Sequence, residues 1–256
     1  MPDAILHNGG MECFLILFLF SAHVISDFLV QSSRVAREKE EHVQVLLLHG
    51  ILTLLTTLVI TIPFWGRKLL PGIVVLAVFH TAIDWWKART EPRWKETLAT
   101  FLADQALHGI SVVIVWLILV RVGATDELWF AIPVDWFEPA TIVLVVAAGF
   151  VFNGKGGTAI VRKLLERYPD VLPDREGKDA AAYSMGRMIG DLERFITYTL
   201  VLLGQWGALG FIIAAKSIAR FRELERQSFA DYYLIGTLSS LLVAIVTGIV
   251  VSGLIR

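Results

Sequence analysis

Cysteine is nearly absent from this chain: Cys13 is the only one among 256 residues. A single cysteine excludes a disulfide within the chain and a cysteine-rich metal site. Charge is also scarce, because Asp, Glu, Lys and Arg make up 18% of the residues, against about a quarter in an average soluble protein. The net charge of −1 shows no basic excess of the kind that binds nucleic acid. We therefore expect no nucleic-acid partner.

Two other signals are missing. The first twelve residues contain no Lys or Arg, and a cleaved signal peptide needs a positive segment there, so we expect the first apolar segment to stay in the mature protein. No Gly-x-Ser-x-Gly motif occurs, and the glycine-rich segment Asn153–Thr158 lacks the spacing of a phosphate-binding P-loop.

Apolar residues are abundant instead. They make up 55% of the chain, and the mean hydropathy is +0.64. A helix needs roughly 20 apolar residues to cross a bilayer, and an open strand cannot satisfy its backbone in lipid. We therefore predict an all-α, polytopic transmembrane helix bundle with about eight spans (seven or eight). The candidate spans are Glu12–Ser32, His42–Phe64, Leu69–Lys87, Thr97–Val122, Pro139–Gly157, Tyr183–Gly204, Trp206–Phe221 and Tyr232–Leu254.

These spans form two predicted units. Residues 1–122 are a four-helix unit, and residues 139–256 are a second unit of about four helices with a cytoplasmic loop near 159–182. Between them, residues 123–138 form an acidic, aromatic loop outside the cytoplasm. Lys and Arg concentrate in alternate connections, which places those connections in the cytoplasm and both termini outside. The segment Asn153–Gly157 is expected to end or break the fifth span.

Three spans carry a histidine and an aspartate four residues apart: His23/Asp27, His80/Asp84 and Asp104/His108. Residues at this spacing share one face of a helix, and ionisable residues inside membrane helices are expensive and are functional by default. The fourth span runs opposite to the first and third and also reverses the order of the pair. All three pairs therefore match in depth. Together with His49 in the second span, they fall in the cytoplasmic half of the bilayer when counted at 1.5 Å per residue.

Four histidines and three aspartates suit a borderline divalent metal, with zinc first and iron or manganese as alternatives. The predicted metal ligands are His23, His49, His80, His108, Asp27, Asp84 and Asp104. The three aspartates are also the candidate catalytic bases, and Gln31 continues the Asp27 face by one turn. Two other interpretations stay open at this point. The side chains could be polar contacts that hold helices together, or they could form a proton or ion pathway.

The strings HVISDFLVQ (His23–Gln31), HTAIDWWK (His80–Lys87) and DQALH (Asp104–His108) resemble a bacterial membrane family catalogued as domain of unknown function 3307. The resemblance covers roughly Phe14 to Val122. It implies a multi-pass protein of the bacterial inner membrane and marks the His, Asp and Gln positions of the three strings, without implying an activity. The layout is also similar in style to membrane-bound metal-dependent hydrolases.

The C-terminal half carries its own intramembrane charges. Arg187, Asp191 and Arg194 share one helix face, so Asp191 can pair with either arginine. Glu193 needs a partner, and Lys216 and Arg220 are candidates for it. These charges could snorkel to the inner interface, or they could hold the anionic part of a lipid headgroup.

We therefore expect a membrane metal-dependent hydrolase acting on a lipid-like or membrane-associated substrate. In it the metal would lower the pKa of a bound water and polarise the scissile group, and a carboxylate would take the proton. A proton- or ion-coupled transporter that uses the same residues as a relay, and a non-catalytic membrane scaffold, are the alternatives. The sequence predicts neither the substrate nor the oligomeric state.

Overall fold

The computed structural model describes residues 10–90, 97–130, 132–168, 180–225 and 227–255, and every regular element within these residues is a helix. The predicted all-α fold is therefore confirmed. The chain divides into two compact units, residues 1–151 with 254–256 and residues 152–253. This division falls after Val151, whereas the fifth predicted span begins at Pro139 and is expected in the C-terminal unit.

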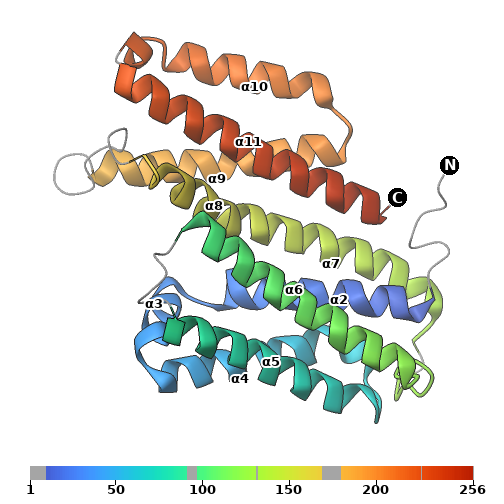
Figure 1. The fold of residues 1–256 in the computed structure, drawn as a ribbon. Coiled ribbons are helices and arrows are strands. Elements are labelled where there is room, and N and C mark those ends of the chain that lie inside the picture. The colour runs from blue at the N-terminus through green and yellow to red at the C-terminus, as the bar shows by residue number, and fades with distance from the viewer. Residues whose placement is uncertain (1–9, 91–96, 131, 169–179, 226, 256) are drawn as a thin grey trace. The chain divides into compact units, whose positions relative to one another are not determined.

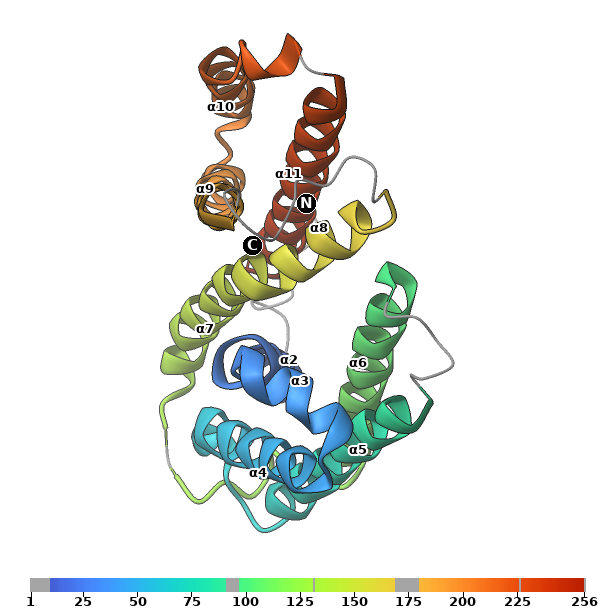
Figure 2. The same ribbon diagram turned by 90° about the vertical axis from the view of Figure 1, so that its left-hand side faces the viewer.

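The first unit is built around its first helix. Its elements are α2 (Met11–Ile25), the π-helical turn η1 (Ser26–Val30), α3 (Ser33–Glu41), α4 (Val43–Ile60), η2 (Ile62–Phe64), α5 (Leu69–Thr90), α6 (Leu98–Arg121), η4 (Val134–Trp136) and α7 (Phe137–Val151) (Figure 1). Helix α2 contacts α4, α6 and α7, and Figure 2 shows it between them. In the most apolar 18-residue segment of this first span, 56% of the residues are buried, against 28–33% in the corresponding segments of the other candidate spans. A polar side chain on the inner face of α2 is therefore shielded by several helices.

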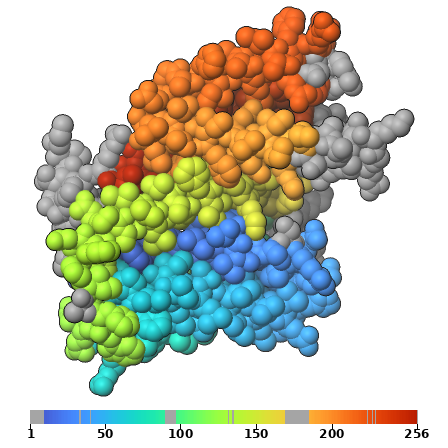
Figure 3. All heavy atoms as spheres, turned by 180° about the vertical axis from the view of Figure 1, so that it is seen from behind, coloured from blue at the N-terminus to red at the C-terminus, as the bar shows by residue number. Residues whose placement is uncertain are grey.

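The outside of the first unit is apolar. Helix α4 alone exposes a row of large aliphatic side chains: Val43, Leu47, Leu48, Ile51, Leu55 and Val59. In Figure 3, α4 (cyan) and the adjoining α3 (blue) form a continuous surface on one face of this unit. A soluble protein rarely exposes so large a contiguous apolar patch, whereas a helix that faces lipid requires one.

The second unit consists of the π-helical turn η5 (Phe152–Gly156), α8 (Gly157–Leu165), α9 (Ala180–Leu202), α10 (Trp206–Ala219), η7 (Glu223–Glu225) and most of α11 (Gln227–Ile255). Helix α9 packs against α8, α10 and the π turn.

Six helical segments of the described chain are long and apolar enough to cross a membrane, as a multi-pass membrane protein requires. They are Met11–Val30, Val43–Ile60, Leu69–Arg89, Leu98–Arg121, Phe137–Leu165 and Phe229–Ile255. The two other predicted spans correspond to α9 and α10. Helix α9 carries four charged residues close together (Arg187, Asp191, Glu193 and Arg194). Helix α10 has only 14 residues, about 21 Å of helix against a hydrocarbon core of about 30 Å.

Two helices differ from the prediction through a π-helical turn. The first span does not continue as one α-helix to Ser32, because Ser26–Val30 winds as the π turn η1. In the fifth span the glycine-rich segment interrupts the α-helical hydrogen bonding but does not end the helix, since it forms η5 and runs on into α8. Arg194 compensates for the altered turn: its guanidinium donates to the carbonyls of Asn153 at 2.6 Å and Gly154 at 3.4 Å.

Arg194 is the polar centre of the second unit. Its side chain is 3% exposed, and besides the two carbonyls it donates to Thr158 Oγ1 at 2.5 Å and Ser240 Oγ at 3.0 Å. It also forms an ion pair with Asp191. One guanidinium therefore links η5, α8, α9 and α11.

The close approach of α4 and α5 depends on Gly50, and we predict that Gly50→Ala destabilises the first unit. A Cβ at Gly50 would come closer than 3.0 Å to Thr81 Oγ1, whose hydroxyl donates to the Ala77 carbonyl at 2.8 Å. Overpacking of this kind costs about 1–3 kcal/mol. Thermal unfolding in detergent measures the effect. Gly109→Ala is the matched control, because its Cβ would meet only Phe20, at an ordinary 3.6 Å. Equal stability of the two variants would contradict the prediction.

The second prediction concerns Arg194. Arg194→Met leaves the partly exposed Asp191 without its arginine partner and removes the donor from two π-turn carbonyls, and each buried acceptor left unsatisfied costs about 1–3 kcal/mol. We expect a clear drop in the melting temperature of the detergent-solubilised protein. Arg187→Met, on the same helix but exposed, should melt close to the unmodified chain. Comparable losses in both variants would show that Arg194 does not hold this unit together.

Candidate metal centre

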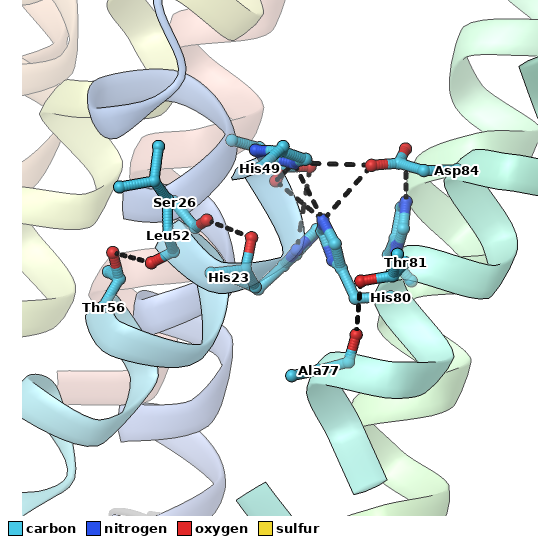
Figure 4. Close-up of polar contacts among 12 residues, drawn as sticks. His23, Ser26, His49, Leu52, Thr56, Ala77, His80, Thr81 and Asp84 are labelled. Carbon is cyan, nitrogen blue, oxygen red and sulfur yellow. Dashed lines mark hydrogen bonds and ion pairs between the residues drawn. The ribbon is translucent and has the colours of Figure 1, made fainter. Parts of the chain in front are cut away.

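The four helices α2, α4, α5 and α6 direct the predicted residues into one buried cluster. His49, His80 and His108 are 0%, 3% and 1% exposed, and Figure 4 shows His49, His80 and Asp84 pointing toward one another. His23 and Asp27 come from α2 and its π turn, where His23 Nδ1 lies 3.8 Å from Asp27 Oδ2. π turns inside α-helices often mark functional sites.

Three atoms at the centre of the cluster form a compact triangle. His49 Nε2 lies 3.1 Å from His80 Nε2, and Asp27 Oδ1 lies 3.6 Å from the first nitrogen and 3.4 Å from the second. Nitrogen and oxygen ligands at 2.0–2.2 Å from a tetrahedral metal are about 3.3–3.6 Å apart. The triangle therefore has nearly the dimensions of one face of such a site, and the three residues are among the groups that could hold an ion.

Asp84, Asp104 and His108 form a second group of potential ligands. His108 Nε2 lies 3.7 Å from Asp84 Oδ1 and 3.6 Å from Asp104 Oδ1. The other oxygen of each carboxylate faces a lysine, since Lys39 Nζ donates to Asp84 Oδ2 at 2.8 Å and Lys87 Nζ lies 3.6 Å from Asp104 Oδ2. Two of the three carboxylates in the cluster are thus paired with an ammonium group.

Asp27 is the carboxylate without such a partner. Among the described residues, the cationic or potentially cationic groups within 4.0 Å of it are the three histidines His23, His49 and His80. Its Oδ1 is buried and accepts no hydrogen bond. A buried charge needs a counter-charge, so the Asp27 corner is where an added cation would be most stabilising.

A third group of potential ligands consists of three imidazoles from three helices, those of His23, His80 and His108. A cavity of about 10 Å³ adjoins them, which is room for about one water molecule. Polar and apolar side chains complete its wall: Leu19, Thr53, Thr57, Leu76, Ser111 and Val112. The cluster therefore borders a small space beside His80.

The donor set fits a divalent cation. Six buried atoms of the cluster have no hydrogen-bond partner in the described structure: His23 Nδ1, Asp27 Oδ1, His49 Nδ1, Asp104 Oδ1, His108 Nδ1 and His108 Nε2. Leaving such groups unsatisfied costs about 1–3 kcal/mol each, and more for charged groups. Imidazole nitrogen with carboxylate oxygen is the ligand chemistry of zinc, iron and manganese sites.

Lys39 and Lys87 reach the cluster although the sequence motifs do not mark either of them as a site residue. The Lys39 side chain is 11% exposed and contacts Asp84, and Lys87 pairs with Asp104. Ser32 caps α3 by accepting the Val35 N–H at 3.2 Å, and Val35 and Lys39 share a face one turn apart. Gln31 also takes part: with its amide oriented to satisfy both neighbours, it donates to the Asp27 carbonyl at 3.3 Å and accepts from Lys39 Nζ at 3.2 Å.

The charged residues predicted in the C-terminal half lie in the second unit and form pairs of their own. Asp191 pairs with Arg194, and Lys216 Nζ donates to Glu193 Oε2 at 2.6 Å. The predicted pairing of Glu193 with Lys216 is thus present. Arg187 is exposed, and the suggested anion-binding role of these residues stays a prediction.

Comparison with known proteins finds a family match for residues 14–137. No curated protein and no solved structure matches the chain. Residues 14–137, which contain all seven His and Asp residues of the cluster, match the model of a protein family. That family is described as "Protein of unknown function (DUF3307)", and residues 14–137 match it, in agreement with the three motifs.

Proposed function

We propose that the first unit binds one divalent metal ion at Asp27, His49 and His80, and that the protein is a membrane metal-dependent hydrolase. The observation that carries the proposal is the triangle of Asp27 Oδ1, His49 Nε2 and His80 Nε2, with edges of 3.1, 3.4 and 3.6 Å. Zinc is the first choice, with iron or manganese as alternatives, because the donor set is mixed imidazole and carboxylate.

The number of ligands favours catalysis over a purely structural role. Structural zinc sites are usually closed by four protein ligands, whereas catalytic sites keep three and leave the fourth position to water. The triangle supplies three ligands, and one of them, His80, also lines the cavity of about 10 Å³, which would offer space for a water. A metal bound there would lower the pKa of its water toward neutrality and polarise the scissile bond.

The remaining residues of the cluster would serve that chemistry. His23 Nδ1 faces the second oxygen of Asp27 at 3.8 Å and would orient this ligand, as outer partners do in metal sites. Asp84 Oδ2 lies 3.6 Å from His80 Nε2 and is the nearest carboxylate to accept a proton. Asp104 and His108, the latter 3.7 Å from Asp84 Oδ1, would hold Asp84 in place.

The substrate and the topology are part of the proposal. The apolar exterior of the unit supports a lipid-like or membrane-associated substrate. The distribution of Lys and Arg supports an inner-membrane protein with the cluster in the cytoplasmic half and both termini outside. Eight spans would require α9 and α10 to enter the membrane as well, in addition to the six long apolar helices.

The first test is metal content. We expect the detergent-purified protein to contain close to one equivalent of zinc, iron or manganese by elemental analysis. His49→Ala and His80→Ala each remove one of three ligands and should weaken binding by at least about 100-fold, the upper range for outer partners. His42→Ala is the control, because His42 is exposed at the start of α4. A metal-free native protein, or metal retained in both ligand variants, would overturn the metal site.

The second test separates the hydrolase from the carrier. Full-length protein in vesicles of zwitterionic and anionic phospholipid should release lipid hydrolysis products, followed by mass spectrometry, and a chelator should abolish the release. Asp84→Asn, which removes the proton acceptor, should reduce turnover by about 10²–10⁴-fold. Absence of turnover together with a potential-dependent ion flux would instead identify the carrier. A normal phenotype in His23→Ala, His80→Ala and His108→Ala would leave only a scaffold.

A further inference from the structure

Helix α3 places an ammonium group inside the candidate metal centre. Helix α3 packs on α4 and α5, and its residue Lys39 reaches Asp84 Oδ2 at 2.8 Å, with 2% of the Asp84 side chain exposed. With the Gln31 amide in the orientation that satisfies both of its neighbours, its oxygen accepts from the same Nζ at 3.2 Å. Two acceptors thus hold the Lys39 ammonium against one oxygen of one carboxylate.

That oxygen is also the nearest candidate for a fourth metal ligand. Asp84 Oδ2 lies 3.4 Å from His49 Nε2 and 3.6 Å from His80 Nε2, close to the distances from Asp27 Oδ1 to the same nitrogens. A divalent ion at the triangle would attract this anionic oxygen. If Asp84 bound it, four protein ligands would close the site, and closed sites are structural rather than catalytic.

We propose that Lys39 is a positioning residue that keeps Asp84 out of the metal's coordination sphere and so preserves the open position for water. The inference rests on the proposed metal site at Asp27, His49 and His80. The short contact between Lys39 Nζ and Asp84 Oδ2 competes with coordination, because the ammonium offsets the negative charge that would attract the metal and its charge-assisted hydrogen bond holds this oxygen toward α3.

Lys87 provides the internal comparison. Its Nζ lies 3.6 Å from Asp104 Oδ2, so it also neutralises a carboxylate of the cluster. In the described structure, however, Asp104 pairs with His108, and neither His49 nor His80 lies within 4.0 Å of it. A lysine that acts only as a counter-charge and a lysine that withholds a ligand therefore occur in the same cluster, and a test can separate the two roles.

The test uses full-length, detergent-purified protein loaded with Co²⁺, with azide as a probe of the open position. Azide replaces a metal-bound water and changes the visible absorption of Co²⁺. We expect the unmodified protein and Lys87→Met to respond to azide. Lys39→Met should bind Co²⁺ at least as tightly but lose azide affinity by at least about tenfold, the lower range for outer-partner effects on a metal site.

A double variant rules out a simple loss of positive charge. The double variant Lys39→Met with Asp84→Asn lacks the same ammonium. The amide at position 84 is a weaker metal ligand than the carboxylate it replaces, so the azide response should return. Continued loss in the double variant, or an unchanged response in Lys39→Met, would overturn the role of Lys39. If Lys39→Met does not fold, Gln31→Leu removes one of the two acceptors of the ammonium and should lower azide affinity in the same direction. An unchanged response there would also overturn it.

The outcomes for the two proposals differ. Failure of the unmodified protein to bind Co²⁺ would remove the metal site itself, together with everything that rests on it. Binding of Co²⁺ and azide by the unmodified protein, with identical behaviour of Lys39→Met and Lys87→Met, would keep the metal site and remove only the assignment of Lys39.

Discussion

The stability of the first unit depends on how the negative charges of three carboxylates are offset, because the helices around them face lipid. Charged side chains at the centre of a membrane helix cost about 2.5–3.5 kcal/mol each on insertion scales, and carboxylates close together repel. Lys39 and Lys87 compensate Asp84 and Asp104. Among the described residues, the potentially cationic groups within 4.0 Å of Asp27 are imidazoles. The geometry of the whole cluster follows from this asymmetry, because the uncompensated oxygen is the one that forms the triangle with His49 and His80.

The cluster could be predicted from the sequence because helix periodicity is simple. A spacing of four residues puts both side chains of a pair on one face, and alternating span direction explains why only Asp104/His108 is reversed. His49 followed from its depth in the second span. The family match supports the same region, since residues 14–137 contain all seven positions.

Three features could not be predicted from the sequence: the π turns, the position of the Lys39 side chain and the division into units. They depend on local winding of the helices and on packing between elements. The π turns at Ser26–Val30 and Phe152–Gly156 have no simple periodic signal, and the second is supported by Arg194 from a distant helix. Lys39 lies in a basic connection of the kind that signals topology, and only the packing of α3 on α4 and α5 shows where its side chain ends. For the same reason the division after Val151 could not be read from apolar run lengths.

The arrangement of hydroxyl groups next to the cluster argues for a local metal site rather than a relay. A proton pathway needs a chain of groups whose hydrogen bonds can be passed on. Beside the imidazoles, Thr57 and Ser111 instead donate to backbone carbonyls of their own helices, at 2.8 and 2.7 Å, and Thr53 pairs only with Ser26, at 2.7 Å. Beyond them the core is aliphatic, with Val115 and Leu119 each 2% exposed. On the side away from Lys39 and Lys87, the polar groups of the described residues therefore end at a small cavity, which supports the proposed site for one ion and one water.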